Sequence, residues 1–198
     1  MSLEDIIARC LKVGINCLGI ADHNKLAGAL KMKEIAPFSI IPGEEILTAE
    51  GEIIGFFLSQ EIPSKLPVEE TVARIKAQDG LVCIPHPYDM LRFSVFRDQV
   101  FDDIMPDVDI IEVFNARSLS PGSSTRAWEL ARKYGKLASA GSDAHTLSEI
   151  GNAYVEMPDF NGKDEFMASM AKGKISGNRS NPTAHFVSTW NRLKKRWF

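Results

Sequence analysis

Segments with helical apolar spacing alternate with short apolar runs typical of buried strands along most of this 198-residue chain. The first helix is expected between Ser2, a candidate N-cap, and Gly14, a C-terminal stop. Further helices are expected over Leu26–Ala36, Pro67–Gln78, Thr125–Tyr134 and Lys163–Lys172. Strands are expected over Ile15–Ile20, Phe38–Ile41, Ile46–Leu58 (a pair turned at Glu50-Gly51), Leu81–Ile84, Val108–Phe114, Leu137–Ala140 and near Asn152–Glu156. This alternation predicts an α/β fold with right-handed crossovers and a mostly parallel sheet.

An open doubly wound sheet and a closed barrel both satisfy this pattern, and the polar residues decide between them. Three of the four histidines stand just after predicted strands: His23, His86 and His145. Four acidic residues lie at those strand ends or one or two residues beyond: Asp22, Glu45, Glu112 and Asp143. In a parallel barrel the carboxyl ends of all strands meet on one face, where catalytic groups gather. Imidazoles and carboxylates converging from several strands are a metal-binding set, so we predict a barrel with a metal site.

Each of these signals is weak when it is taken alone. A histidine after a strand is more often a hydrogen-bonded structural residue, and Asp22-His23 could be a turn and cap pair. Asp143 and His145 carry more weight, because alternate residues on an extended segment point to the same side. Gly43 before Glu45 indicates close backbone packing at a strand end. The coincidence of all these positions is what predicts a site.

The composition is that of a soluble globule: 44% of residues are hydrophobic, 25% are charged, and the net charge is −3. The longest apolar stretch, near Ile53–Leu58, is far too short to span a membrane. Glu4 and Asp5 stand where a signal peptide would be basic and then apolar. Three cysteines among apolar neighbours are expected to be buried thiols, so we expect a cytoplasmic protein. No linker or composition break divides residues 1–198, which predicts a single domain.

The end of the chain is basic. Seven of the 23 basic residues and none of the 26 acidic residues lie from Phe166 onward. Phe186, Trp190, Leu193 and Trp197 are spaced like the apolar stripe of a packed helix, so a basic C-terminal helix is expected over about 184–197. We interpret it as a docking helix with a solvated basic face; nucleic acid is the alternative partner and is not favoured.

The polar motifs together resemble a known family. They are Asp22-His23-Asn24, Pro42-Gly43-Glu44-Glu45, Pro85-His86-Pro87, Glu112-x-x-Asn115-x-Arg117 and Gly141-Ser142-Asp143-Ala144-His145. Their order is similar to that of the PHP (polymerase and histidinol phosphatase) family, in its branch of metal-dependent phosphoesterases. The resemblance covers nearly the whole chain and implies a distorted (β/α)7, TIM-like barrel.

The resemblance also implies a cleft with one to three divalent metal ions, which would be Zn, Mn, Fe or Mg. The metal ligands that it implies are His23, Glu45, His86, Asp143 and His145, with Glu45 as a bridging carboxylate and Asn115 as a further candidate. Of these, His23, Asp143 and His145 are the expected catalytic residues. Metal-activated water would then attack a small phosphate ester or a nucleotide, with no serine or cysteine nucleophile. Arg92, Arg117 and Arg179 are candidates to hold the phosphate oxygens.

One departure from the family stands out: the chain lacks the first strand and its His-x-His motif. Met1 is then either an internal methionine of a longer protein, or the start of a domain that has lost catalysis and acts in ligand or partner binding. Impaired turnover is expected in either case. Edges left unpaired by a missing strand favour self-association, so we also predict a homo-oligomer. The hypotheses for function are a phosphoesterase, a degenerate binding module, and metal-dependent deacetylation or amide hydrolysis with the same ligands.

Overall fold

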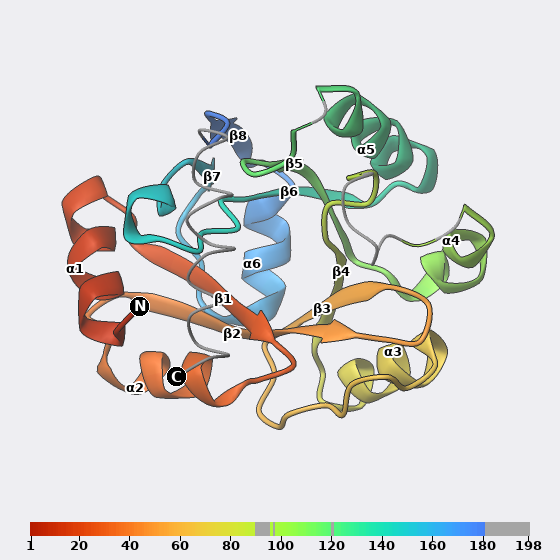
Figure 1. The fold of residues 1–198 in the computed structure, drawn as a ribbon, viewed down its shortest axis with the longest axis horizontal. Coiled ribbons are helices and arrows are strands. Elements are labelled where there is room, and N and C mark those ends of the chain that lie inside the picture. Colours follow the sequence, from red (N-terminus) through yellow and green to blue (C-terminus); the bar gives the residue numbers. More distant parts are fainter. Residues whose placement is uncertain (90–95, 97, 120, 181–198) are drawn as a thin grey trace, which may run out of the picture.

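The structure is a computed structural model that describes residues 1–89, 96, 98–119 and 121–180 (Figure 1). The predicted C-terminal helix over 184–197 and Arg92 lie outside the described residues. The helices are α1 (Leu3–Val13), α2 (Ala27–Ile35), α3 (Val68–Ala77), α4 (Asp98–Ile104), α5 (Pro121–Tyr134), α6 (Gly162–Met170) and the 3-10 turns η1 (Met105–Asp107) and η2 (Leu147–Glu149). The strands are β1 (Cys17–His23), β2 (Ser39–Leu47), β3 (Glu52–Phe56), β4 (Leu81–Ile84), β5 (Ile110–Asn115), β6 (Leu137–Gly141), β7 (Ala153–Glu156) and β8 (Lys174–Gly177).

Local sequence signals explain where helices begin and end. The hydroxyl of Ser2 accepts a hydrogen bond from the Asp5 amide at the start of α1, and Gly14 ends the helix with φ of 77°. Asp79 follows α3 with φ of 58°, and Gly135 follows α5 with φ of 63°. The helices α1, α2, α3, α5 and α6 match the predicted positions within a few residues, whereas α4 and β8 were not predicted.

Six strands form one curled sheet in the order β1-β2-β3-β4-β5-β6, and β7 pairs with β8 in a separate sheet (Figure 1). The pairs β1–β2, β4–β5 and β5–β6 are parallel, while β3 runs antiparallel to both β2 and β4. The expected α/β class with helix crossovers is therefore confirmed. The antiparallel β3 is the second strand of the hairpin that was predicted over Ile46–Leu58.

A closed barrel is not what the described residues form. Among them, β1 and β6 are the outer strands of the six-stranded sheet, and they do not pair with each other. Closure around a core filled by side chains takes about eight strands, so six curled strands make a partial barrel. Within the described residues, β1 and β6 are the two edge strands of this sheet, and self-association through such edges stays a prediction.

Two apolar clusters lie on the two faces of this sheet. The outer cluster joins the sheet to the surrounding helices, with Ile75 of α3 and Leu130 of α5 against Ile84 and Ile111 of the strands. The inner cluster lies inside the curl, where α6 contributes Phe166 and Met170 (Figure 1). Its members from the strands are Ile41, Leu81, Cys83 and Ile110, with Cys17, Ile54, Phe56 and Leu137 packed against them. The inner face is therefore apolar toward the end where α6 packs.

In the described part of the chain, no helix has both the length and the apolar character needed to cross a lipid bilayer.

Candidate metal centre

Strand alternation places the polar residues directly above the inner apolar cluster. Successive residues of a strand point to opposite faces, so every second residue of β1 from Cys17 leads to His23. The same step leads from Ile41 of β2 to Glu45, and from Ile110 of β5 to Glu112. The polar residues at the strand ends therefore share the inner face with the apolar cluster, one layer further along the strands.

Glu44, the residue before Glu45 on β2, points to the opposite face of the sheet, as strand alternation requires. It is fully buried, and its carboxylate accepts a hydrogen bond of 2.9 Å from the amide of Ile62. Glu45 faces the histidines of the inner face instead. Two adjacent glutamates thus have separate surroundings, and only Glu45 belongs to the centre.

Glu45 lies between two imidazoles. Its Oε2 is 3.0 Å from Nδ1 of His23, and its Oε1 is 3.1 Å from Nε2 of His86. The His86 side chain is only 3% exposed, whereas that of His23 is 52% exposed. The register of β1 and β2, which pairs His23 with Glu45, brings the first contact about. The carboxylate therefore links a buried imidazole to one at the mouth of the site.

Glu52, at the start of β3, is a fourth member that the sequence analysis missed. Its Oε1 is 3.8 Å from Nδ1 of His23, and its Oε2 is 3.8 Å from Nε2 of His86. Ligand atoms of His23, Glu45 and Glu52 all lie within 4.8 Å of one another. Because β3 is antiparallel, its first residue reaches the rim where the parallel strands end. Glu52 alternates with Ile54 and Phe56 along the strand that pairs with β2, and this alternation was the sequence signal that could have identified it.

Hydrogen bonds between these groups change their protonation. Burial alone would raise the pKa of Glu45, but hydrogen bonds from His23 and His86 and their charges outweigh it and hold that pKa far below its usual range. The hydrogen bond with Glu45 raises the pKa of His23 to about 8, against the opposing effect of burial. At neutral pH, the metal-free site thus pairs an ionised carboxylate with a largely protonated His23.

A second group of residues comes from β5 and β6. The buried Glu112 carboxylate accepts hydrogen bonds from the His86 amide at 2.8 Å and from Nδ2 of Asn115 at 3.0 Å. Burial raises the pKa of Glu112. A Cβ at Gly141 would lie 2.0 Å from its Oε1, so only glycine fits opposite this carboxylate. Glu112 therefore holds the loop that carries His86.

Asn115 extends this group toward Asp143. Its Nδ2 lies 3.4 Å from Oδ2 of Asp143, and its Oδ1 accepts a hydrogen bond of 2.9 Å from the Arg117 amide. The Nδ1 of His145 lies 2.9 Å from the carbonyl oxygen of Asp143. Because a carbonyl can only accept, Nδ1 carries the proton, and Nε2 keeps the lone pair that a metal would need. The ligand role of Asn115 stays a prediction.

His145 and His23 meet across the mouth of the curl. Their ring centroids are 6.3 Å apart, and the ring planes are tilted by 53°. These two side chains come from the two outer strands and their following loops, β1 and β6. The structure thus brings the N-terminal and C-terminal predicted ligands to one place.

The backbone is strained at three positions of the site. His86, Asp143 and Asn24 have positive φ values of 30°, 48° and 52°, in a region that non-glycine residues seldom adopt. Hydrogen bonds hold Asn24, because its amide donates to the Glu45 carbonyl and its Oδ1 accepts from the Leu47 amide. Such strain concentrates at functional sites, which supports the assignment of this rim.

Arg117 has a different setting from the one expected of a substrate-binding side chain. It is buried, and its Nη1 donates to Oε1 of Glu149 at 2.7 Å. The other oxygen of Glu149 accepts hydrogen bonds from the amides of His145 and Thr146 at 3.0 and 2.9 Å. Arg117 and Glu149 thereby fix the loop that presents His145. The substrate role of Arg117 stays a prediction, and no local pattern predicts this pairing across 32 residues.

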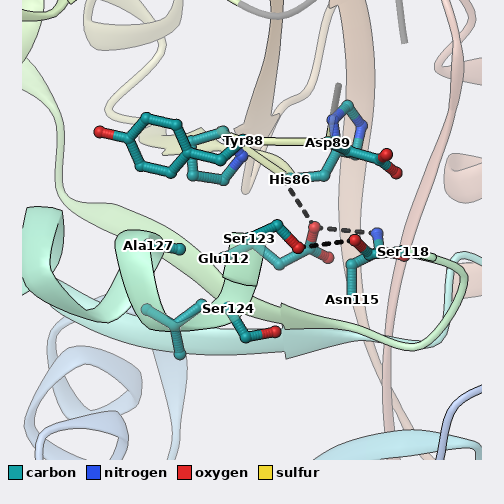
Figure 2. Close-up of a pocket in the computed structure, with 11 residues that line it drawn as sticks. His86, Tyr88, Asp89, Glu112, Asn115, Ser118, Ser123, Ser124 and Ala127 are labelled. Atoms are coloured by element: carbon teal, nitrogen blue, oxygen red, sulfur yellow. Dashed lines mark hydrogen bonds between the residues drawn. The ribbon is translucent and has the colours of Figure 1, made fainter. Parts of the chain in front are cut away.

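A small pocket adjoins the centre on the α5 side (Figure 2). Its lining includes His86, Tyr88, Asn115, Ser118 and Ser123. The hydroxyl oxygens of Ser118 and Ser123 are 2.7 Å apart. The Nη1 of Arg179 donates to the carbonyl of Ser118 at 2.7 Å, so this predicted substrate-binding residue reaches the same region.

The donor set fits a divalent metal ion. Two ligand atoms on one tetrahedral zinc ion lie about 3.4 Å apart, given bonds of about 2.1 Å. The distances from the carboxylate oxygens of Glu45 and Glu52 to the histidine nitrogens range from 3.0 to 3.8 Å, and this range includes that value. Imidazole nitrogen and carboxylate oxygen are ligands that zinc, manganese and iron accept. The identity and number of ions stay predictions.

Comparisons with known proteins identify chains of similar sequence and fold. The family model described as PHP-associated matches residues 121–175. Two uncharacterised proteins of Methanocaldococcus jannaschii are 39% and 41% identical over 158 and 116 residues, which are 77% and 57% of this chain. The chain spans less than two thirds of the first relative, 62% of its length, and 66% of the second.

Solved structures share the fold at low sequence identity. PsfC from Pseudomonas syringae matches with a TM-score of 0.69 and 16% identity, over 96% of this chain and 88% of that one. A two-domain protein from Bacteroides vulgatus, which contains a predicted PHP-like metal-dependent phosphoesterase, matches with a TM-score of 0.69 and 14% identity, over 89% and 60%. An amidohydrolase from Chromobacterium violaceum matches with a TM-score of 0.56 and 16% identity, over 73% and 82%. The family-model match over residues 121–175 and the shared fold support the predicted membership of the PHP family.

Proposed function

We propose that this chain is a metal-dependent phosphoesterase that hydrolyses a small phosphate ester or a nucleotide. The observation that carries the proposal is the placement of Glu45 between the imidazoles of His23 and His86. The Bacteroides vulgatus protein of similar fold, which contains a predicted metal-dependent phosphoesterase, supports the same class of reaction. We propose the same activity for the whole protein.

The residues that would hold the metal ions are His23, Glu45, His86, Asp143 and His145. When bound, divalent ions lower the pKa of a coordinated water and neutralise charge on phosphoryl oxygens. Glu45 is suited to its role because its low pKa keeps the carboxylate ionised at neutral pH. His23 releases its proton when it becomes a ligand, since only the neutral imidazole has a free lone pair.

His145 is the proposed metal ligand at the mouth of the site. Its side chain is 39% exposed at the mouth, and its Nδ1 is anchored on the Asp143 carbonyl. An anchored imidazole keeps one orientation, which directs Nε2 and its lone pair toward the ion. Oδ1 of Asp143 lies 3.5 Å from the same Nδ1.

Arg179 is the proposed phosphate-binding residue, and its hydrogen bond to Ser118 supports this role. Its guanidinium donates a hydrogen bond to the Ser118 carbonyl, and Ser118 lines the pocket together with His86. A guanidinium can hold two phosphate oxygens at once, so Arg179 would orient the ester toward the centre.

The test is metal analysis of the purified chain, followed by phosphate release from p-nitrophenyl phosphate with added Mn²⁺ or Zn²⁺. Glu45→Gln and His145→Ala should each lower the rate at least about tenfold, the lower bound for loss of a group that supports a metal site. Glu69→Gln, an exposed glutamate on α3, is the matched control and should keep the parent rate.

If Glu45→Gln and His145→Ala hydrolyse the ester at the parent rate, the site assignment is wrong. Tight nucleotide binding without turnover, unchanged by chelators, would replace the enzyme with a binding module. Hydrolysis of an N-acetyl amide without hydrolysis of the phosphate ester would instead place the chain with the amidohydrolase of similar fold.

A further inference from the structure

Two carboxylates, not one, lie between the same pair of imidazoles. Glu45 directs Oε2 to His23 and Oε1 to His86, and Glu52 directs Oε1 to His23 and Oε2 to His86. The contacts of Glu45 are 3.0 and 3.1 Å, and both contacts of Glu52 are 3.8 Å. Each carboxylate therefore offers a separate oxygen to each imidazole.

The two carboxylates are close together and largely shielded from water. An oxygen of Glu45 and one of Glu52 lie within 4.8 Å, and the two side chains are 10% and 13% exposed. Two negative charges at this separation, with little solvent around them, attract a cation, and a metal ion is the strongest local source of positive charge.

The position of Glu52 explains why two ions fit better than one. A single ion can take one oxygen from each carboxylate and leaves the other two oxygens directed at the second imidazole. With two ions, one next to His23 and one next to His86, both oxygens of both carboxylates have a partner. Pairs of metal ions in hydrolytic sites lie about 3.5–4 Å apart, a separation that carboxylates bridge.

We propose that Glu52 is a second bridging ligand, so that Glu45 and Glu52 together hold a pair of divalent ions, one at His23 and one at His86. This inference rests on the metal centre of the proposed function and adds to it a residue from the antiparallel strand β3. Since each ion receives two carboxylate oxygens and one imidazole nitrogen from these four residues, the pair suits Mn²⁺ or Fe²⁺.

The experiment loads the metal-free full chain with Mn²⁺ and measures bound manganese per chain and its EPR spectrum. The parent should bind a spin-coupled pair. Glu52→Gln should lose the coupling and bind the second ion at least about tenfold more weakly, the lower bound for loss of a group that supports a metal site. Glu69→Gln should behave like the parent.

A folding control keeps the result interpretable. Without metal, Glu52→Gln should melt close to the parent temperature, because an amide of nearly the same size replaces the carboxylate; with Mn²⁺ it should gain less stability than the parent. Glu52→Asp, whose shorter side chain keeps the charge but cannot span both imidazoles, should also lose the coupled pair.

An unchanged coupled pair in Glu52→Gln and Glu52→Asp overturns the inference, whatever the esterase assay shows. A coupled pair that depends on Glu52, in a chain that hydrolyses no phosphate ester, supports the inference and contradicts the proposed function.

Discussion

The two halves of the centre are built in different ways. In the first half, formed by β1, β2 and β3, donor atoms contact one another directly, as Glu45 does with His23 and His86. In the second half, formed by β5, β6 and the loop after β6, polar groups mainly hold backbone in place. Glu112 binds the His86 amide, and Glu149 binds the His145 amide. One half supplies ligands, and the other half mostly sets their positions.

Substitutions of equal size should therefore have different consequences in the two halves. Changes to ligands should reduce metal binding and leave the fold intact, as Glu52→Gln tests. Changes to the positioning groups should reduce stability first, because these groups are buried and paired.

The largest effect is expected from breaking the buried pair of Arg117 and Glu149. Glu149→Ala leaves a buried guanidinium without this carboxylate and removes the hydrogen bonds to the His145 loop, which should lower the free energy of unfolding by about 3–5 kcal/mol. Urea denaturation measures the loss. The double variant Arg117→Leu/Glu149→Leu should recover part of the stability but not the metal affinity; recovery of both would mean that the pair does not position His145.

A somewhat smaller effect is expected at Gly141. Gly141→Ala would place a methyl group 2.0 Å from Oε1 of Glu112, and overpacking of this kind destabilises a protein by about 1–3 kcal/mol. Gly28→Ala is the matched control. Its methyl would meet Oδ2 of the exposed Asp22 side chain, which can move aside. Equal unfolding midpoints for the parent and Gly141→Ala would contradict the tight packing of Glu112.

The smallest effect concerns His23 in the metal-free chain. Its folded-state pKa of about 8 lies above its ordinary value of 6.5, so the protonated ring stabilises the folded state. That stabilisation is complete below pH 6.5 and disappears as the pH rises through 8. Thermal melts in EDTA should therefore show a decrease of a few degrees between pH 6 and pH 9. His23→Gln should lose this pH dependence; an equal decrease in that variant would assign it to another group.

Much of the fold and several members of the site could be predicted from local patterns. The helices follow from apolar spacing and from end signals such as Ser2 and Gly14. The strand-end positions of His23, His86 and His145 follow from short apolar runs that stop at polar residues. These signals are local, because period and capping involve residues only a few positions apart.

Other features depended on partners that are distant in the chain. Glu52 belongs to the centre because β3 reverses direction and returns its first residue to the rim. Arg117 is buried because Glu149, 32 residues further along, lies beside it. No local pattern distinguishes a surface arginine from one with a buried partner, so the sequence could offer Arg117 only as a candidate.

By itself, the sequence determined the order of helices and strands and which residues stand at strand ends, because alternation and capping act over a few residues. Only the tertiary structure decided that the sheet of the described strands curls without closing, that Glu52 joins Glu45 between two imidazoles, and that Gly141 faces Glu112. Those outcomes depend on which strands become neighbours and in which direction, and strand pairing is a contact between segments far apart in the chain.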